Sequence, residues 1–314
     1  MATDQNAPID IRKDGASFGL AIDANSTKKV APWADATGLC TSALRHRSMC
    51  TSRDTRTAET FLINSRLVRN RPQTALSIAN YFNDAITVAL SMAGRELVDE
   101  SKVIPLPDNI ALDMPLEEAI LRRRSVRKFT GDPMELDFLA TLIRATAGVT
   151  ARARVRLASG TERSLHFRSA PTAGGLYPAE LYVAAVNVKG LEPGVYRYNA
   201  VQDQLFFELP ADRVVALKQT FAIDEQIISL QRANAYLYLV SHPWKVMRKY
   251  GDRGMRFVFM DVGYMCQNLH LAAQALGVGT VDCAAVYDDE AHEILGIDGV
   301  FRALVHSVVI GMPG

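Results

Sequence analysis

Cysteines are few and long apolar runs are absent, and each absence excludes a class of protein. The 314 residues include four cysteines, Cys40, Cys50, Cys266 and Cys283, which are widely spaced and form no CxxC pair. A small disulfide-stapled secreted domain carries more cysteines for its length. No apolar run reaches the ~18 residues of a membrane-spanning helix, and the first 15 residues lack the apolar core of a signal peptide. We therefore expect a reduced, cytoplasmic protein without a membrane partner.

An excess of charge of either sign is also absent. The chain carries 35 Lys and Arg residues against 34 Asp and Glu residues, a formal net charge of +1. This balance creates no overall field that would attract nucleic acid or a membrane surface, so any anion site must be local. With 48% apolar and 22% charged residues, the composition is that of an ordinary folded protein.

Several common catalytic motifs are missing as well. The sequence contains no P-loop, no HExxH and no GxSxG motif, and its six histidines show no metal-ligand spacing. Gly277-Val-Gly279 follows a predicted helix instead of opening one, so it indicates a helix end and a turn rather than a dinucleotide-binding loop. We expect no metal site, and we interpret His270 as a core or interface residue.

Three regions differ in composition along the chain. Residues 1–56 are rich in Thr, Ser, Ala, Asp and Arg without sustained periodicity, which predicts a loosely ordered arm. Residues 57–110 form a mainly helical extension: an apolar stripe extends to residue 97, and the segment 104–109, with two prolines, predicts a linker. Residues 111–314 carry the strongest signals and form the predicted main domain.

The order of elements in the main domain predicts an α+β fold. Asp132-Pro-Met-Glu135 has the pattern of a capping box, and the apolar face that follows ends at Gly148. Period-two alternation then predicts an antiparallel meander, and no regular βαβ alternation is present. The remaining expected elements are strands at 181–188, 194–198, 204–209, 235–241, 280–286 and 303–311, and helices at 211–234, 255–276 and 290–295.

The first segment that suggests chemistry is Arg123 to Phe129. Arg123 and Arg127 are four residues apart with Ser125 between them, at the exit of a predicted helix. Two guanidinium groups and a hydroxyl suit a phosphate, which arginine binds bidentately. The alternative is a basic helix end that complements the helix dipole.

The second segment is Ser169 to Pro178, with paired glycines just before the meander. Small residues and glycines allow the backbone to approach a flat ligand closely, and its amides can bind polar ring atoms. The alternative is an ordinary turn that leads into a strand.

The third segment is Lys249 to Gly254, where two glycines predict a loop with a Lys-Tyr pair at its tip. A loop can direct adjacent side chains at one ligand, and a lysine partly buried among apolar groups can act as a general base. The alternative is a solvated turn with a packed tyrosine.

Taken in order, these segments resemble one family. Residues 111–314 are similar to the FMN-dependent nitroreductase superfamily, which implies a mainly antiparallel central sheet flanked by helices and an intertwined homodimer. Lys249 to Gly254 and the meander narrow the resemblance to the SagB/McbC-type dehydrogenases, and residues 60–107 resemble the N-terminal extension of that family. Further similarity lies in Asp261–Leu269, Leu271–Gly279, Asp288-Asp289 and Val309–Pro313.

The resemblance implies FMN as the cofactor and assigns its contacts. In the family, an Arg-Ser-basic pattern holds the phosphate and ribityl chain, a small-residue loop lies against the flavin ring, a polar residue at a helix start touches the ring, and a backbone amide reaches flavin N5. Here these groups correspond to Arg123, Ser125 and Arg127, to Pro171, Thr172, Ala173 and Gly174, to Gln226, and to Ala284 and Ala285.

Lys249 and Tyr250 correspond to the family's catalytic pair. The resemblance implies an FMN-dependent dehydrogenase that converts thiazoline or oxazoline rings to thiazoles or oxazoles in a ribosomally made peptide. One of the two side chains would take a ring proton and the other would orient the ring; the sequence leaves open which one is the base. It also leaves open the identity of the peptide and the preference for sulfur or oxygen rings.

Two other functions compete with this one. The first is an NAD(P)H-dependent nitro- or quinone reductase, which needs neither the Lys-Tyr pair nor the extension. The second is a flavin-bound structural subunit of a peptide-modifying complex. The expected partners are the azoline-containing precursor peptide and a second copy of the chain, with a cyclodehydratase complex of the YcaO type as an optional addition.

Overall fold

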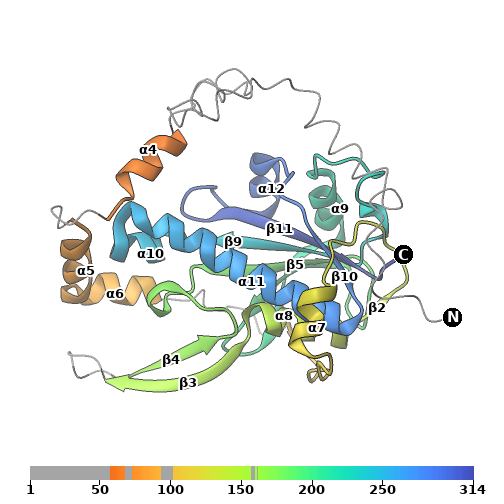
Figure 1. Cartoon of the computed structure of the whole chain (residues 1–314), viewed down its shortest axis with the longest axis horizontal. Helices are drawn as coiled ribbons and strands as arrows, with labels where there is room; N and C mark the ends of the chain where they lie inside the picture. The colour runs from red at the N-terminus through yellow and green to blue at the C-terminus, as the bar shows by residue number, and fades with distance from the viewer. Residues whose placement is uncertain (1–56, 68–72, 93–101, 157–159, 161) are drawn as a thin grey trace. The chain divides into compact units, whose positions relative to one another are not determined.

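The computed structural model describes residues 57–67, 73–92, 102–156, 160 and 162–314 (Figure 1). Contacts divide the chain into two units: residues 1–66 with 224–228, and residues 67–223 with 229–314. The described part of the first unit is helix α4 (Thr57–Asn64), the residues that follow it and the turn at 224–228. The predicted arm, residues 1–56, lies outside the described residues, and the predicted boundary at residue 110 stays a prediction.

A seven-stranded sheet forms the centre of the larger unit. Its order is β1-β8-β7-β5-β9-β11-β10, and every neighbouring pair is antiparallel. The predicted meander appears as β5, β7 and β8, so the mainly antiparallel α+β fold is confirmed. The strands are β1 (Val103–Pro105), β5 (Ala179–Ala185), β7 (Gly194–Asn199), β8 (Gln204–Pro210), β9 (Ala235–Ser241), β10 (Gly279–Asp282) and β11 (Ala303–Gly311).

Helices cover both faces of this sheet (Figure 1). On one face, α8 (Leu136–Ala147) packs against α11 (Gly254–Leu276), and both contribute to the main apolar core. The other face carries α9 (Ala211–Gln219) and α12 (Asp288–Leu295). Helix α11 ends as predicted at Gly277, whose φ of 69° suits a residue without a side chain.

The predicted helical stripe near residues 57–97 is divided into short helices. Besides α4 it contains α5 (Gln73–Asn83) and α6 (Ala85–Met92), which pack against α10 (Pro243–Tyr250). Tyr81 of α5 is buried with Leu176, Val246 and Val258. This small apolar cluster connects the extension to α10, to α11 and to the loop that precedes β5.

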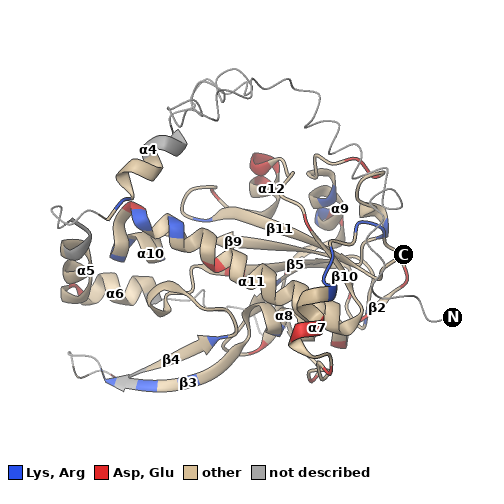
Figure 2. Cartoon of the chain, viewed as in Figure 1, with Lys and Arg blue, Asp and Glu red and all other residues tan. Residues whose placement is uncertain are grey.

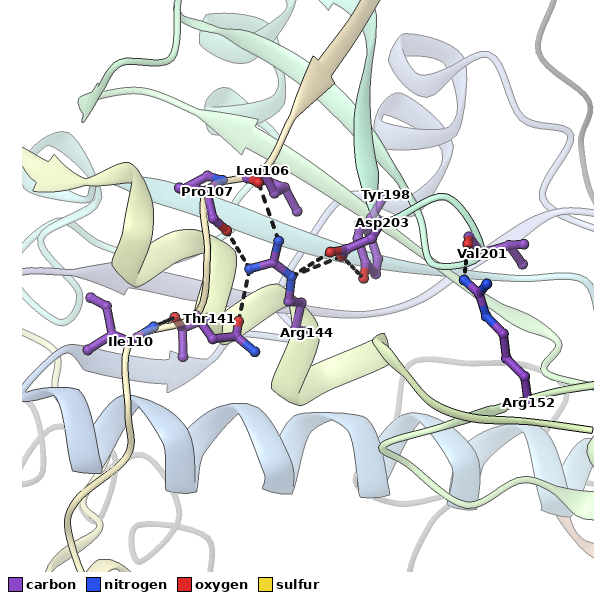
Figure 3. A network of polar contacts seen from close by, with 10 residues as sticks. Leu106, Pro107, Ile110, Thr141, Arg144, Arg152, Tyr198, Val201 and Asp203 are labelled. Atoms are coloured by element: carbon purple, nitrogen blue, oxygen red, sulfur yellow. Dashed lines mark hydrogen bonds and ion pairs between the residues drawn. The ribbon is translucent and has the colours of Figure 1, made fainter.

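The segment predicted as a linker at 104–109 is instead held firmly against the domain. Its first part is β1, an edge strand that pairs with β8 and therefore tolerates Pro105. Arg144 of α8 then donates hydrogen bonds to the carbonyls of Leu106 and Pro107 and forms an ion pair with Asp203 (Figure 3). These contacts of Arg144 explain why a proline-rich segment is ordered here.

Two predicted helix boundaries were wrong. Helix α8 begins at Leu136 rather than after Asp132, because β2 (Met134–Glu135) pairs in parallel with β6 (Val188–Lys189). The helix predicted at 211–234 ends at Gln219, where the Thr220 hydroxyl donates to the Leu217 carbonyl.

A separate two-stranded sheet consists of β3 (Val149–Arg156) and β4 (Glu162–Arg168). Helix α7 (Leu116–Arg122) precedes the first basic segment.

Candidate active site

The loop between β4 and β5 has an unusual backbone. Gly174 and Gly175 have φ angles of 66° and 71°, within a 3-10 turn at Ala173–Gly175. Tyr177 also has a positive φ, 43°, which is uncommon for a residue with a side chain. Its N–H donates to Thr172 Oγ1 (3.2 Å), and its hydroxyl accepts from the Arg168 N–H (2.9 Å). Such held conformations often occur at functional sites.

The Lys-Tyr pair lies directly against this loop. A Cβ built on Gly174 would come within 2.7 Å of Tyr250 Oη and 2.8 Å of Lys249 Nζ. The structure thus brings together two segments that lie 75 residues apart in the sequence. The predicted loop position of the pair was wrong, because both residues form the last turn of α10, which ends at Gly251. Both side-chain ends still reach the same glycine.

Lys249 lies in an aromatic environment that sequence patterns did not reveal. The residue is 8% exposed, and its ammonium lies 4.7 Å from the ring centre of Phe82, 5.2 Å from that of Tyr250 and 5.4 Å from that of Tyr81. Ring faces attract a cation at these distances. The helical extension therefore supplies two side chains to the site through α5.

Asp261 of α11 is a second residue that sequence patterns missed. It is 4% exposed and accepts hydrogen bonds from the Thr172 hydroxyl (2.5 Å) and from the backbone N–H of Ala173. Burial raises the pKa of Asp261 to about 6, although both hydrogen bonds oppose this rise. The sequence signal that could have revealed Asp261 is its charge on the buried face of an otherwise apolar helix. Asp261 holds the start of the glycine loop, at Thr172 and Ala173, against α11.

The predicted phosphate segment follows α7 and lies beside β10. The Val126 N–H donates to the Thr280 carbonyl (2.9 Å), so the segment extends the sheet edge. Arg127 Nη1 makes a long hydrogen bond to the Ser125 carbonyl (3.4 Å), and Ser125 and Arg123 are half-buried. The side chain of Arg124 instead turns back onto the carbonyls of Leu121 and Arg123.

The remaining predicted flavin contacts are placed differently. Ala284 and Ala285 are exposed just beyond β10, and neither has a positive φ, so alanine is compatible with the backbone there. Gln226 does not start a helix as predicted. It lies in a turn of the other unit, where its N–H donates to the Asp224 carboxylate (2.6 Å), and its role stays a prediction.

The two groups of predicted site residues lie at opposite ends of α11. The glycine loop contacts Asp261, and the basic segment contacts Gly279, just past the C-terminal end of the helix. Fifteen residues separate Asp261 from Leu276, which corresponds to roughly 22 Å. In Figure 2, Lys and Arg residues colour the ribbon in both places, on α10 and on the segment beside β10.

A cluster of polar side chains lies beside the end of β10, near Ala284. Asp282 joins His270 Nε2 (2.9 Å) and His306 Nε2 (2.8 Å), and Cys266 Sγ lies with Asp282 and His306 within 4.8 Å. Burial alone would raise the pKa of Asp282, but the hydrogen bonds from the two histidines bring it well below its ordinary value. Burial raises the pKa of Cys266 to about 12. Hydrogen bonds to Asp282 hold the two histidines together, a grouping that the spacing of the histidines did not predict.

Comparison with known proteins decides the family. The family model described as "Nitroreductase family" matches residues 120–312, well over half of the chain. The chain belongs to the nitroreductase family. Within the part that the structure describes, no helix is long and apolar enough to cross a membrane.

Individual proteins resemble this nitroreductase-family chain in sequence or in fold. Two of them carry the description of putative nitroreductase. MJ1384 of Methanocaldococcus jannaschii is 37% identical over 202 residues, covering 62% of this chain and 89% of that protein. A crystal structure from Ralstonia eutropha JMP134 superimposes with a TM-score of 0.53 at 24% identity, covering 70% of this chain and 94% of that one.

A third relative is the "Trifolitoxin-processing protein TfxB" of Rhizobium leguminosarum bv. trifolii. It is 25% identical over 148 residues, which are 46% of this chain and 40% of that protein. The chain therefore matches less than half the length of this relative.

Proposed function

We propose that the protein is an FMN-dependent dehydrogenase that oxidises thiazoline or oxazoline rings of a ribosomally made peptide to thiazoles or oxazoles. The observation that carries this proposal is the position of Lys249 Nζ and Tyr250 Oη, both against Gly174 of the loop predicted to face the flavin. Family membership supports a flavin enzyme. The name of the trifolitoxin-processing relative supports a peptide as the substrate.

The residues present fit FMN. Arg123, Arg127 and Ser125 are a donor set suited to a phosphate, and all three are half-buried rather than fully buried. Gly175, beside Gly174, has open space where a side chain would be, so the loop can approach a flat ring closely. Pro171, Thr172, Ala173 and Gly174 would face the ring, with Ala284 and Ala285 near its edge.

The chemistry divides between the cofactor and the protein. Conversion of an azoline to an azole removes two protons and two electrons from the ring. Bound FMN supplies the acceptor for the electron pair and one hydrogen. Lys249 Nζ or Tyr250 Oη takes the other hydrogen as a proton from the ring carbon, and the second side chain orients the ring. The aromatic rings around Lys249 exclude water and fix its position.

We infer that two copies of the chain complete each site, because the two groups of flavin contacts lie at opposite ends of α11. Exposed apolar side chains on α11, Phe259, Met260 and Tyr264, would be covered by a second copy. A groove beside α7, lined by Leu112, Met114, Leu116 and Leu271 among others, continues this apolar surface. A homodimer would bring the arginines of one chain to the glycine loop of the other.

A nitro- or quinone reductase is the second candidate, favoured by the description of the M. jannaschii relative. It would reduce its flavin with NAD(P)H and would not need Lys249. Flavin reduction by an azoline peptide but not by NAD(P)H supports the dehydrogenase; the opposite pattern supports the reductase. A flavin-bound protein that neither substrate reduces would be a structural subunit. A YcaO-type partner stays a prediction.

The cofactor assignment is tested by Arg123→Ala combined with Arg127→Ala. Each lost charge-assisted contact is worth ~1.5 to 3 kcal/mol, so we expect FMN affinity to fall by roughly two to four orders of magnitude in a folded protein. Arg124→Ala is the matched control, because the Arg124 side chain bonds to backbone carbonyls instead. Flavin content is measured by absorbance of the purified protein. A double variant with full flavin content would refute the phosphate site.

A further inference from the structure

Three side chains of metal-ligand type meet where α11 packs against β10 and β11 (Figure 1). They are Cys266 of α11, Asp282 at the end of β10 and His306 of β11, and their sulfur, oxygen and nitrogen atoms all lie within 4.8 Å of one another. A thiolate, a carboxylate and an imidazole are the ligand types that bind Zn²⁺ in proteins. The prediction of no metal site rested on the spacing of histidines, which does not reveal ligands that come from three elements.

The register of the sheet explains why these side chains meet. Asp282 lies opposite Val308 in the antiparallel pair of β10 and β11, so His306, two residues before Val308, lies on the same face of the sheet. Val308 belongs to the apolar core to which α11 contributes, and Cys266 is a buried member of that core. Asp282 and His306 therefore both face the helix that carries Cys266.

Hydrogen bonds within the cluster account for the histidines but not for the sulfur. The two carboxylate oxygens of Asp282 are engaged separately, one by His306 Nε2 (2.8 Å) and the other by His270 Nε2 (2.9 Å). Cys266 is 7% exposed and makes no hydrogen bond among the described residues, although its sulfur lies beside both Asp282 and His306. A soft sulfur atom next to an oxygen and a nitrogen favours Zn²⁺ over Mg²⁺ or Ca²⁺, which prefer oxygen ligands.

The spacing of the three ligand atoms is close to that around a zinc ion. Zn–S bonds of ~2.3 Å and Zn–N or Zn–O bonds of ~2.0 to 2.1 Å place tetrahedral ligands roughly 3.3 to 3.6 Å apart. The carboxylate and imidazole, now 2.8 Å apart, would separate slightly, and the sulfur would approach them. The side chains of Asp282 and His306 are 47% and 21% exposed, so both have room to adjust.

His270 supports the cluster without being one of the three ligands. It follows Cys266 by four residues on α11, so the two side chains lie on the same face of the helix, one turn apart. Its Nε2 bonds to Asp282, and its Nδ1 bonds to the Thr280 hydroxyl (2.8 Å), so both ring nitrogens are engaged. Outer hydrogen-bond partners of this kind orient a metal ligand and raise metal affinity.

We propose that Cys266, Asp282 and His306 bind one Zn²⁺ ion, and that His270 positions the Asp282 carboxylate. Three protein ligands leave the fourth tetrahedral position for a water molecule, as in open zinc sites. Binding displaces the thiol proton of Cys266, so the sulfur coordinates as a thiolate. The inference is independent of the proposed reaction, because it uses neither the Lys-Tyr pair nor a predicted flavin contact.

The test measures zinc binding to the flavin-loaded protein after dialysis against a chelator. Titration calorimetry with Zn²⁺ should give a stoichiometry of one ion per chain. X-ray absorption at the zinc edge should then show one sulfur ligand at ~2.3 Å and three nitrogen or oxygen ligands at ~2.0 to 2.1 Å. Neither measurement depends on the flavin or on the turnover of a substrate.

Variants locate the ion. Loss of an outer partner typically weakens metal affinity by ~10 to 100-fold, so we expect a loss of this size in His270→Leu. Cys266→Ser and His306→Gln each remove a ligand and should cost at least as much. Cys283→Ser is the matched control, because Cys283 is also a buried free cysteine but lies outside the cluster. If Cys266→Ser does not fold, His306→Gln and Asp282→Asn, at partly exposed side chains, still decide the assignment.

The site is overturned if the wild type does not bind zinc at micromolar concentration, if the bound zinc has no sulfur ligand, or if Cys266→Ser and His306→Gln both bind as the wild type does. Two sulfur ligands, or loss of zinc from Cys283→Ser, would assign the ion to other cysteines and would also overturn it. A single sulfur ligand that disappears in Cys266→Ser supports the site, whether or not the protein oxidises azolines.

Discussion

Gly174 is the residue at which the loop predicted to face the flavin meets the Lys-Tyr pair, and a methyl group there has two separable effects. Gly174→Ala strains a backbone with φ of 66° and also displaces Lys249 Nζ and Tyr250 Oη. Gly175→Ala strains a backbone with φ of 71° but meets no atom within 4 Å. Comparing the two substitutions therefore separates backbone strain from displacement of the Lys-Tyr pair.

We expect both alanine variants to lose about 1 to 2 kcal/mol of unfolding free energy, measured by denaturant titration. Only Gly174→Ala should lose azoline oxidation, because only there must the pair move. Equal rates of oxidation in the two variants would show that contact with Gly174 does not matter for the reaction.

The raised pKa of Asp261 makes the unfolding free energy depend on pH. Its pKa is raised to about 6 from an ordinary value of 3.8, so the folded state holds this proton more tightly than the unfolded state does. The contribution of Asp261 to the unfolding free energy is therefore most favourable below pH 4 and is lost as the pH rises through 6.

Relative to wild type, Asp261→Asn should therefore gain stability as the pH rises from 4 to 7, as measured by unfolding midpoints across that range. Thr172→Val removes a hydrogen bond that lowers this pKa, so it should move the transition to higher pH. A difference between wild type and Asp261→Asn that stays constant from pH 4 to 8 would contradict a raised pKa.

Residue patterns revealed one part of the site and not the other. The paired glycines and the adjacent Lys249 and Tyr250 stand out in the sequence because their chemistry is local. Asp261 and Phe82 do not, because what matters about them is contact with a distant segment. Thr172 and Asp261 are 89 positions apart, and only the packing of α11 under the loop brings them together.

At the scale of elements, α11 was predicted within one residue, since its apolar face is long and Gly277 ends it. The start of α8 was missed because the backbone of Met134 pairs with a neighbouring strand instead of continuing a capping box. Likewise, the prolines near residue 105 indicated a linker, whereas an edge strand pinned by Arg144 formed there. In both places, strand pairing with a distant segment determined the structure instead of the local sequence pattern.

The proposed homodimer predicts that a second copy of the chain covers the exposed apolar side chains of α11. Phe259→Glu places a charge among apolar side chains that a second copy would cover, so we expect a monomer with little FMN. Val215→Glu, at an exposed apolar position of α9, is the control and should remain dimeric. Sedimentation velocity and flavin absorbance on the same samples give both readouts. Monomeric Phe259→Glu with full FMN would show that one chain suffices for the cofactor.

At the scale of the whole molecule, the antiparallel sheet and its covering helices followed from alternation and motif order. The distance along α11 between the two groups of predicted flavin contacts did not, because it depends on how segments far apart in the sequence pack against this helix. The helical extension also contributes side chains to the candidate site. Through Tyr81 and Phe82 it encloses Lys249, which connects the N-terminal helices to the proposed chemistry.

The central claim is that Lys249 and Tyr250 remove a ring proton during azoline oxidation. It is tested most directly by anaerobic single-turnover bleaching of the flavin by an azoline peptide in wild type, Lys249→Ala, Tyr250→Phe and the double variant. Loss of a positioned general base typically slows a reaction by ~10² to 10⁴, and the more damaging single substitution identifies the base. We predict full FMN content and a loss of this size in the double variant. Bleaching at the wild-type rate by the flavin-loaded double variant would contradict the account.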